Sequence, residues 1–175
     1  MLLDVSHWEI DETLNASGLR EKFWLIDPSS GIKYLFKLPR EETGEVWAEE
    51  ISAKIGICLG YSMMDTRIAR HCGRNGILLR NFIQSDNAEF YTGGDLLKTV
   101  NDAFIPTELS IYTLDNIIAC LKPYRLDIKV VPMILFDALI GNQDRHCDNW
   151  GIIREDNSCS FSPLFDNGSS LGCTL

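Results

Sequence analysis

The sequence predicts an α+β fold in two lobes, and three observations support this prediction. The first part of the 175-residue chain holds short β-rich runs around a single segment of helical periodicity. A polar break at residues 84–87, Gln-Ser-Asp-Asn, interrupts this pattern. Beyond the break, most apolar residues recur with helical spacing. We therefore expect a β-rich N-lobe with one helix over residues 1–83, a hinge at 84–87 and a mostly helical C-lobe over 88–175.

Two strands and a turn are expected first along the chain. The runs Lys22–Ile26 and Ile32–Leu38 are rich in aromatic and β-branched residues. The residues between them, 27–31 (Asp-Pro-Ser-Ser-Gly), favour a turn. In the second run Phe36 falls on one face of the strand with the other even-numbered apolar residues, whereas Lys37 falls on the opposite face.

One amphipathic helix is predicted between residues 44 and 56, with Gly56 as its C-cap residue. Its apolar residues repeat at i, i+4 and i+8 and should form one buried stripe: Trp47, Ile51 and Ile55. The helix also carries two adjacent acidic residues. The helical projection places Glu50 nearer to the apolar stripe than Glu49, so spacing alone does not select Glu49 as the functional one.

The remaining elements complete the two lobes. A second hairpin is expected from residues 65–70 and 77–83, with its tight turn at Asn75-Gly76. The C-lobe should contain three helices, a polar loop and a hairpin, in this order: 94–100, 114–124, 131–140, 142–149, and 150–153 with 160–164. The third helix is apolar on nearly every side, so we expect it to be buried on nearly every side.

Composition argues against several classes of protein. With 25 Asp+Glu against 16 Lys+Arg the formal charge is −9, which disfavours nucleic-acid binding. No apolar run approaches the roughly 18 residues of a membrane span, and residues 1–8 lack the basic region of a secretory signal. The six cysteines include no CxxC pair, so we expect reduced, mostly buried thiols in a cytoplasmic chain.

The residues whose side chains could take part in a reaction lie in the loop 141–149 and beyond the hairpin that follows it. Asp144 precedes Asn149 by five residues, and Asp166 follows the hairpin. Phosphoryl transfer needs a carboxylate that orients the attacking hydroxyl, oxygen ligands for Mg²⁺ and a cation on the phosphates. Protein kinases place such residues in this order along the chain. The pattern therefore favours a kinase-type site. The Lys37 ammonium group would be the cation that contacts the phosphates.

Longer motifs resemble one known family. The run Gly-Asn-x-Asp-Arg-His-x-x-Asn-Trp-Gly at 141–151, with Phe-Ser-Pro-Leu-Phe-Asp at 161–166, resembles the HipA-like serine/threonine kinases. The compact CtkA-like members are the most similar, and the runs 17–24, 34–37 and 47–49 fit the same pattern. This family is related to the phosphoinositide-kinase branch of the protein-kinase-like fold. That fold has the same order of elements as the one predicted here.

The resemblance implies roles at the centre of the site. Asp144 would be the catalytic base, and Asn149 and Asp166 would hold Mg²⁺, which prefers such oxygen ligands. Lys37 would contact the α- and β-phosphates of ATP. Glu49 would hold that lysine in place.

The resemblance also implies contacts around the nucleotide. Phe82 and Ile83 would lie at the adenine hinge. The segment around Ser17 and Gly18 would cover the phosphates, and Ser17 is the expected site of autophosphorylation.

Two further implications concern the loop and the end of the chain. Arg145 would help to neutralise the charge of the site, and His146 would fix the catalytic loop from behind. Family members continue with further helices, whereas this chain ends nine residues after Asp166. We therefore expect an apparently truncated C-lobe: the sequence is a fragment, the gene product is shortened, or a C-terminal partner supplies the missing surface.

These observations favour an ATP- and Mg²⁺-dependent protein serine/threonine kinase with an unidentified protein substrate. Two alternatives stay open: a nucleotide-binding module without phosphate transfer, and a phosphoinositide-type lipid kinase, which the charge of −9 does not support. HipA relatives act as growth-arresting toxins. The partners that this interpretation allows are therefore an antitoxin, a C-terminal partner or a second copy of the chain, and not a nucleic acid or a membrane.

Overall fold

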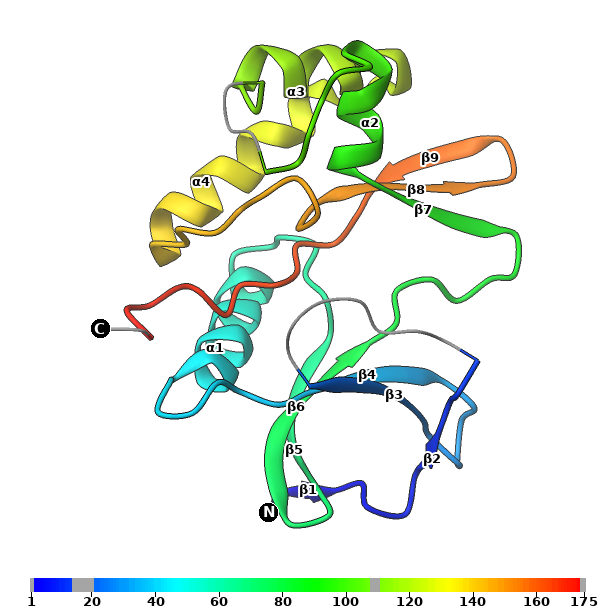
Figure 1. The fold of residues 1–175 in the computed structure, drawn as a ribbon, viewed down its shortest axis with the longest axis vertical. Helices are drawn as coiled ribbons and strands as arrows, with labels where there is room; N and C mark the ends of the chain where they lie inside the picture. Colours follow the sequence, from blue (N-terminus) through cyan, green and yellow to red (C-terminus); the bar gives the residue numbers. More distant parts are fainter. Residues whose placement is uncertain (1, 14–20, 108–110, 174–175) are drawn as a thin grey trace.

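The structure, a computed structural model, describes residues 2–13, 21–107 and 111–173. Figure 1 shows two lobes, the N-lobe with helix α1 below and the C-lobe with helices α2, α3 and α4 above. The α+β fold and the two-lobed arrangement predicted from the sequence are confirmed.

The N-lobe is built on a six-stranded sheet with the order β1-β5-β6-β4-β3-β2. All pairs are antiparallel except β1 with β5. The strands predicted at 22–26 and 32–38 are present as β3 and β4. The bounds of the six strands are β1 (Leu3–Asp4), β2 (Glu9–Ile10), β3 (Lys22–Ile26), β4 (Lys33–Lys37), β5 (Thr66–His71) and β6 (Arg74–Arg80).

The two faces of this sheet have different partners. One face buries a cluster that contains Leu25, Phe36 and Leu78. On the other face Ile77 and Leu79 pack with Val46 of α1, and Leu35 lies against them. Because side chains alternate along a strand, the residue two positions after Leu35 shares its face. Lys37 therefore lies on the side of the sheet that faces α1.

Helix α1 (Glu45–Cys58) presents a different face to the sheet from the predicted one. Trp47 is 62% exposed and Ile51 is 44% exposed, whereas small residues and the two acidic residues are buried. The helix also continues through Gly56, which was expected to cap it, to a C-cap at Leu59. A side chain at Gly56 would meet the Met63 sulfur at 2.3 Å. Small residues allow this close packing, and Trp47 and Ile51 are left outside, whereas Ile55 is partly buried against the C-lobe core.

The turn of the β5–β6 hairpin lies at Cys72 and Gly73, not at Asn75-Gly76 as predicted. Cys72 and Gly73 have φ values of 48° and 79°, which suits the two central residues of a tight hairpin turn. Gly76 lies within β6 instead. A Cβ on Gly76 would come within 2.6 Å of the Lys37 carbonyl oxygen, so glycine is needed there for the close approach of β4.

The C-lobe combines a small sheet with the predicted helices. Its three strands have the order β7-β8-β9. The hairpin expected near residues 150–164 is present, whereas β7 was not predicted. The bounds are β7 (Ala88–Thr92), β8 (Gly151–Glu155), β9 (Ser158–Phe161), α2 (Gly93–Val100), α3 (Leu114–Leu121), α4 (Val130–Ile140) and the short 3₁₀ helices η1 (Lys122–Tyr124) and η2 (Asp127–Lys129).

Helix α4 is not buried on nearly every side as expected. The residues that it buries recur at helical spacing and face the C-lobe core: Val130, Met133, Phe136 and Ile140. The opposite face is apolar yet exposed, at Val131, Ile134, Leu135 and Leu139. A helix that is apolar throughout gives no signal of which side is covered. Among the described residues no helix is both long and apolar enough to cross a membrane.

Two segments join the lobes. Residues 81–87 connect β6 to β7 and contain the predicted hinge. A second junction lies beside Leu164, whose N–H donates to the Ser62 carbonyl at 2.8 Å and whose carbonyl accepts from the Met64 N–H at 3.0 Å. The chain after β9 is thereby held against the N-lobe.

All six cysteines are free thiols, as expected. Only Cys120 and Cys147 are buried, however, while Cys58 and Cys72 are exposed. The expectation that most of the thiols would be buried is therefore wrong.

Candidate active site

The structure brings Lys37 and Asp166 together at the junction of the two lobes. The Lys37 Nζ lies 2.6 Å from Asp166 Oδ1, although the residues are 129 positions apart in sequence. Their side chains are 14% and 32% exposed, so the ion pair is partly shielded but reachable from solvent. Lys37 ends β4, and Asp166 lies on the segment that crosses between the lobes.

Glu49 lies beside this ion pair and is buried, with 3% of its surface exposed. Burial, with the negative charge of Asp166 as a second cause, raises the pKa of the Glu49 carboxyl to about 7, and the Lys37 charge opposes this only in part. Glu50 points elsewhere, because Lys54 and Thr66 bind its carboxylate. Between the two adjacent glutamates, the structure thus places Glu49, and not Glu50, at the lysine.

The loop after α4 holds Asp144 and Asn149. Helix α4 ends because Gly141 adopts a left-handed conformation with a φ of 64°. Asp144 is exposed, whereas Asn149 is buried and its Nδ2 donates to the Asp144 carbonyl at 2.8 Å. Since its amide nitrogen is used in this bond, the Asn149 side-chain oxygen is the atom that could meet a cation.

Arg145 and His146 both make contacts that hold the loop. The Arg145 side chain is only 8% exposed and is bound by Asp137, so its charge is neutralised within the protein. It therefore organises the loop, and its charge also acts on the site as a minor cause that opposes the raised pKa of Glu49. His146 is 43% exposed, and its Nδ1 accepts the Asp148 N–H at 3.2 Å, so its hydrogen bond is local to the loop.

Three aromatic rings gather where the hinge meets the Asp166 segment. The Phe82 ring lies 5.2 Å from the Phe90 ring and 5.6 Å from the ring of Phe165, the residue before Asp166. All three are only partly buried. The next hinge residue, Ile83, donates its N–H to the Asn81 side chain at 3.0 Å.

Two of the predicted site residues, Ser17 and Gly18, lie outside the residues that the structure describes.

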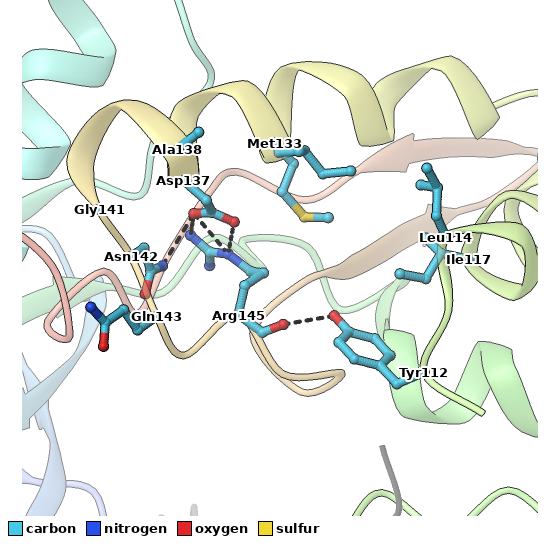
Figure 2. Close-up of a pocket in the computed structure, with 11 residues that line it drawn as sticks. Tyr112, Leu114, Ile117, Met133, Asp137, Ala138, Gly141, Asn142, Gln143 and Arg145 are labelled. Carbon is cyan, nitrogen blue, oxygen red and sulfur yellow. Dashed lines mark hydrogen bonds and ion pairs between the residues drawn. The ribbon is translucent and has the colours of Figure 1, made fainter. Parts of the chain in front are cut away.

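Two cavities near the candidate residues differ in size and in lining. A crevice of about 20 Å³ lies between β4, α1 and the Asp166 segment, and its lining includes Lys37, Glu49 and Asp166. A larger cavity of about 580 Å³ lies between α3, α4 and the loop (Figure 2). It is lined by apolar residues of the two helices and by polar residues of the loop.

The residues at the lobe junction fit a magnesium ion that is shared with phosphates. Among the described residues, no group of three His, Cys, Asp or Glu side chains could hold a metal alone. Mg²⁺ bound with a nucleotide commonly uses one or two protein oxygen ligands together with phosphate oxygens. Asp166 and Asn149 are the two side chains that could supply such ligands here.

The fold and these positions define a class of protein. A strand lysine, a buried glutamate on the following helix, an Asp/Asn loop and a second aspartate after a hairpin are the parts of a two-lobed, kinase-like fold. Comparison with known proteins places the chain more narrowly. Residues 14–172 match the family model described as the HipA-like C-terminal domain, so the chain belongs to this family.

Individual relatives agree with this assignment. The chain is 27% identical over 135 residues to the serine/threonine-protein kinase CtkA of Helicobacter pylori strain J99, an alignment that covers 74% of this chain and 41% of the relative. The crystal structure of the H. pylori proinflammatory kinase CtkA matches with a TM-score of 0.84 and 23% identity over 99% of this chain and 62% of that chain.

A more distant structure has the same fold. The Shewanella oneidensis MR-1 toxin–antitoxin complex of HipA, HipB and operator DNA matches with a TM-score of 0.66 and 15% identity, over 87% of this chain and 43% of that one. The chain therefore spans less than two thirds of each of these relatives. The two solved structures show that the fold is shared, and the family of this chain includes a relative that is named as a serine/threonine kinase.

The functional neighbours that sequence reasoning missed are Asp137 and Asn167. Both are polar residues that bind Arg145, at 2.7 Å in each case. The polar Asp137 within an otherwise apolar helix was a signal, because a buried carboxylate requires a partner. Asn167 follows Asp166 directly and gave no signal of its own.

Proposed function

We propose that this chain is a phosphotransferase that moves the γ-phosphoryl group of ATP, with Mg²⁺, to a serine or threonine hydroxyl of a protein. The observation that carries the proposal is the contact of Lys37 with Asp166 beside the buried Glu49, in a chain that also exposes Asp144 on the loop after α4. These residues supply each of the groups that phosphoryl transfer needs.

Each residue has one task in this proposal. Asp144, which is exposed on its loop, accepts a hydrogen bond from the acceptor hydroxyl and orients its oxygen toward the γ-phosphorus. The hydroxyl oxygen forms the new bond to phosphorus as the bond to the β-phosphate oxygen breaks. The proton of the hydroxyl passes to Asp144 or leaves with the product phosphate.

The positive charges and metal ligands act on the phosphates. Lys37 approaches the α- and β-phosphates, with its position limited by Asp166 and by the buried Glu49. Asn149 and Asp166 would hold Mg²⁺, which offsets the charge on the phosphate oxygens when it is bound. The partly exposed rings of Phe82 and Phe165 offer an apolar surface for the adenine.

The experiment is phosphate transfer from γ-labelled ATP with Mg²⁺, with mass spectrometry of the chain itself and of casein as a generic acceptor. Asp144→Asn removes one carboxylate from the loop without changing its size. Asp148→Asn makes the same change four residues further along, at an exposed position to which we assign no role, and is the matched control.

We expect labelled serine or threonine in the wild type and in Asp148→Asn, and a loss of at least 100-fold in Asp144→Asn. Equal labelling in a folded Asp144→Asn protein would overturn the assignment of the base. Thermal stabilisation by ATP and Mg²⁺ without labelled product in any variant would instead support a nucleotide-binding module without transfer.

The likeness to HipA of a toxin–antitoxin system extends the proposal to growth arrest. Induced expression of the wild-type chain should slow the growth of a bacterial host, whereas Asp144→Asn expressed to the same level should not. Equal growth inhibition by both proteins would separate any toxicity from phosphate transfer. If growth inhibition instead depends on Asp144, the next step is a search for an antitoxin.

A further inference from the structure

The Arg145 guanidinium uses every donor that it has. Its Nε and Nη2 form a two-point contact with the Asp137 carboxylate of α4, at 2.9 Å to Oδ2 and 2.7 Å to Oδ1 (Figure 2). The second Nη2 hydrogen reaches Asn167 Oδ1 at 2.7 Å. The two Nη1 hydrogens reach the carbonyl oxygens of Asn149 at 2.9 Å and of Phe165 at 2.5 Å. Arginine has five N–H donors, and all five are satisfied here.

The acceptors of these bonds surround the two residues that we assign to Mg²⁺. One is the carbonyl of Asn149 itself. Besides Asp137, the remaining two belong to Phe165 and Asn167, which precede and follow Asp166. A single planar group thus connects both proposed metal ligands, which lie on different segments of the chain.

Asp166 needs such support because of its backbone conformation. Its φ is 55°, in the left-handed region that few residues other than glycine occupy. Arg145 holds the residue on either side of it. The conformation that directs the Asp166 carboxylate toward Lys37 is therefore fixed from the C-lobe side.

Asn167 carries the connection onward to the N-lobe. Since arginine can only donate hydrogen bonds, the Asn167 side-chain oxygen must face Arg145 and its Nδ2 must face away from it. That nitrogen lies 3.5 Å from Glu49 Oε1 on α1, and Asn167 is fully buried. The contacts run from α4 through the loop and the Asp166 segment to the helix that carries Glu49.

We propose that Asp137, Arg145 and Asn167 are positioning residues that set the separation of the Asn149 and Asp166 ligands and so determine the affinity for Mg²⁺ with nucleotide. This inference rests on the proposed function, because it concerns the binding of Mg²⁺ and nucleotide at the same site. It differs from a merely structural ion pair, which would stabilise the loop and leave metal affinity unchanged.

Arg145→Lys separates these two possibilities. Lysine keeps the charge beside Asp137, but a single ammonium lacks the planar fork that reaches Asn149 and Phe165 together. The measurement is the Mg²⁺ concentration that gives half of the thermal stabilisation by the non-hydrolysable analogue AMP-PNP, which needs no catalytic turnover. Arg154→Lys, at an exposed position on β8, is the matched control.

We expect the half-saturating Mg²⁺ concentration to rise at least tenfold in Arg145→Lys and to stay unchanged in Arg154→Lys. Saturating Mg²⁺ should restore the full stabilisation in Arg145→Lys, whereas the loss of a purely structural contact would leave the half-saturating Mg²⁺ concentration unchanged. If Arg145→Lys does not fold, Asn167→Ser decides the question. It keeps the Asp137–Arg145 pair but loses the contact toward Glu49, and we expect a threefold to tenfold rise.

The result that overturns the inference is an unchanged Mg²⁺ requirement in a folded Arg145→Lys or Asn167→Ser protein while the wild type is stabilised by Mg²⁺ and AMP-PNP. Failure of the proposed function gives a different result, because the wild type itself would then show no stabilisation that depends on Mg²⁺.

Discussion

The buried Glu49 should make the stability of this protein depend on pH in an unusual direction. The pKa of Glu49 is raised from 4.5 to about 7 on folding. Between these values the folded chain holds a proton that the unfolded chain has lost, so stability attributable to Glu49 is highest at low pH and falls as the pH rises toward 7. Above pH 7 the folded protein carries the full penalty of a buried, poorly compensated carboxylate.

The magnitude follows from the shift. Linkage with pKa values of 4.5 and about 7 predicts that Glu49 lowers the free energy of unfolding by about 1 kcal/mol at pH 5 and by about 3 kcal/mol at pH 8. The substitution Glu49→Gln has nearly the same shape and cannot ionise. The variant should therefore gain about 2–3 kcal/mol relative to wild type when the pH is raised from 5 to 8.

Urea unfolding of both proteins at pH 5 and pH 8 measures this difference, since other titrating groups cancel between them. Glu50→Gln is the control on the same helix. It removes a carboxylate that Lys54 and Thr66 bind, so it should not gain stability at pH 8. A Glu49→Gln protein that loses stability at pH 8 would refute the reasoning, because Glu49 would then be stabilised as an anion, most simply by Lys37.

Three further predictions test the packing. Gly76→Ala should lower the free energy of unfolding by about 1–3 kcal/mol in denaturant titrations, because the new Cβ would lie 2.6 Å from a carbonyl of β4. On α4, Leu135→Gln should change stability by less than about 1 kcal/mol, whereas Met133→Gln at a buried position should cost several kcal/mol; equal effects would contradict the exposed face. With Ellman's reagent, the two exposed cysteines of the native protein should react first. Cys120 and Cys147 should stay unreactive until unfolding, because burial raises the pKa of each thiol to about 11.

Much of the fold could be predicted because its signals are local. Strand β3 is a β-rich run, β4 shows an alternation of its side chains, and the residues between the two strands are typical of a turn. The same alternation placed Lys37 opposite Phe36, on the face that meets α1. The Asp144 loop was also recognisable, since its acidic and amide residues lie within six positions of one another.

The face of α1 could not be predicted from hydrophobicity alone. The helix buries Ala48, Ala53 and Gly56 because small residues allow close contact with its neighbours, and it leaves Trp47 and Ile51 outside. The same rotation buries Glu49. A hydrophobic stripe therefore predicts a helix better than it predicts which side of that helix meets the core.

The polar network of the site could not be predicted for a different reason. Asp137, Arg145 and Asn167 come from three segments, and their contacts exist only once these segments have folded together. Single-residue patterns carry no information about such distances. The sequence showed which residues could do chemistry, whereas the structure showed which residues hold them in place.

The central claim is that Lys37 and Asp166 form one site for nucleotide and Mg²⁺, and isothermal titration with AMP-PNP tests it most directly. The account predicts binding by the wild type that strengthens with Mg²⁺, at least tenfold weaker binding by Lys37→Met, and loss of the Mg²⁺ dependence in Asp166→Asn. Equal affinities in the three folded proteins, with the same response to Mg²⁺, would contradict the account.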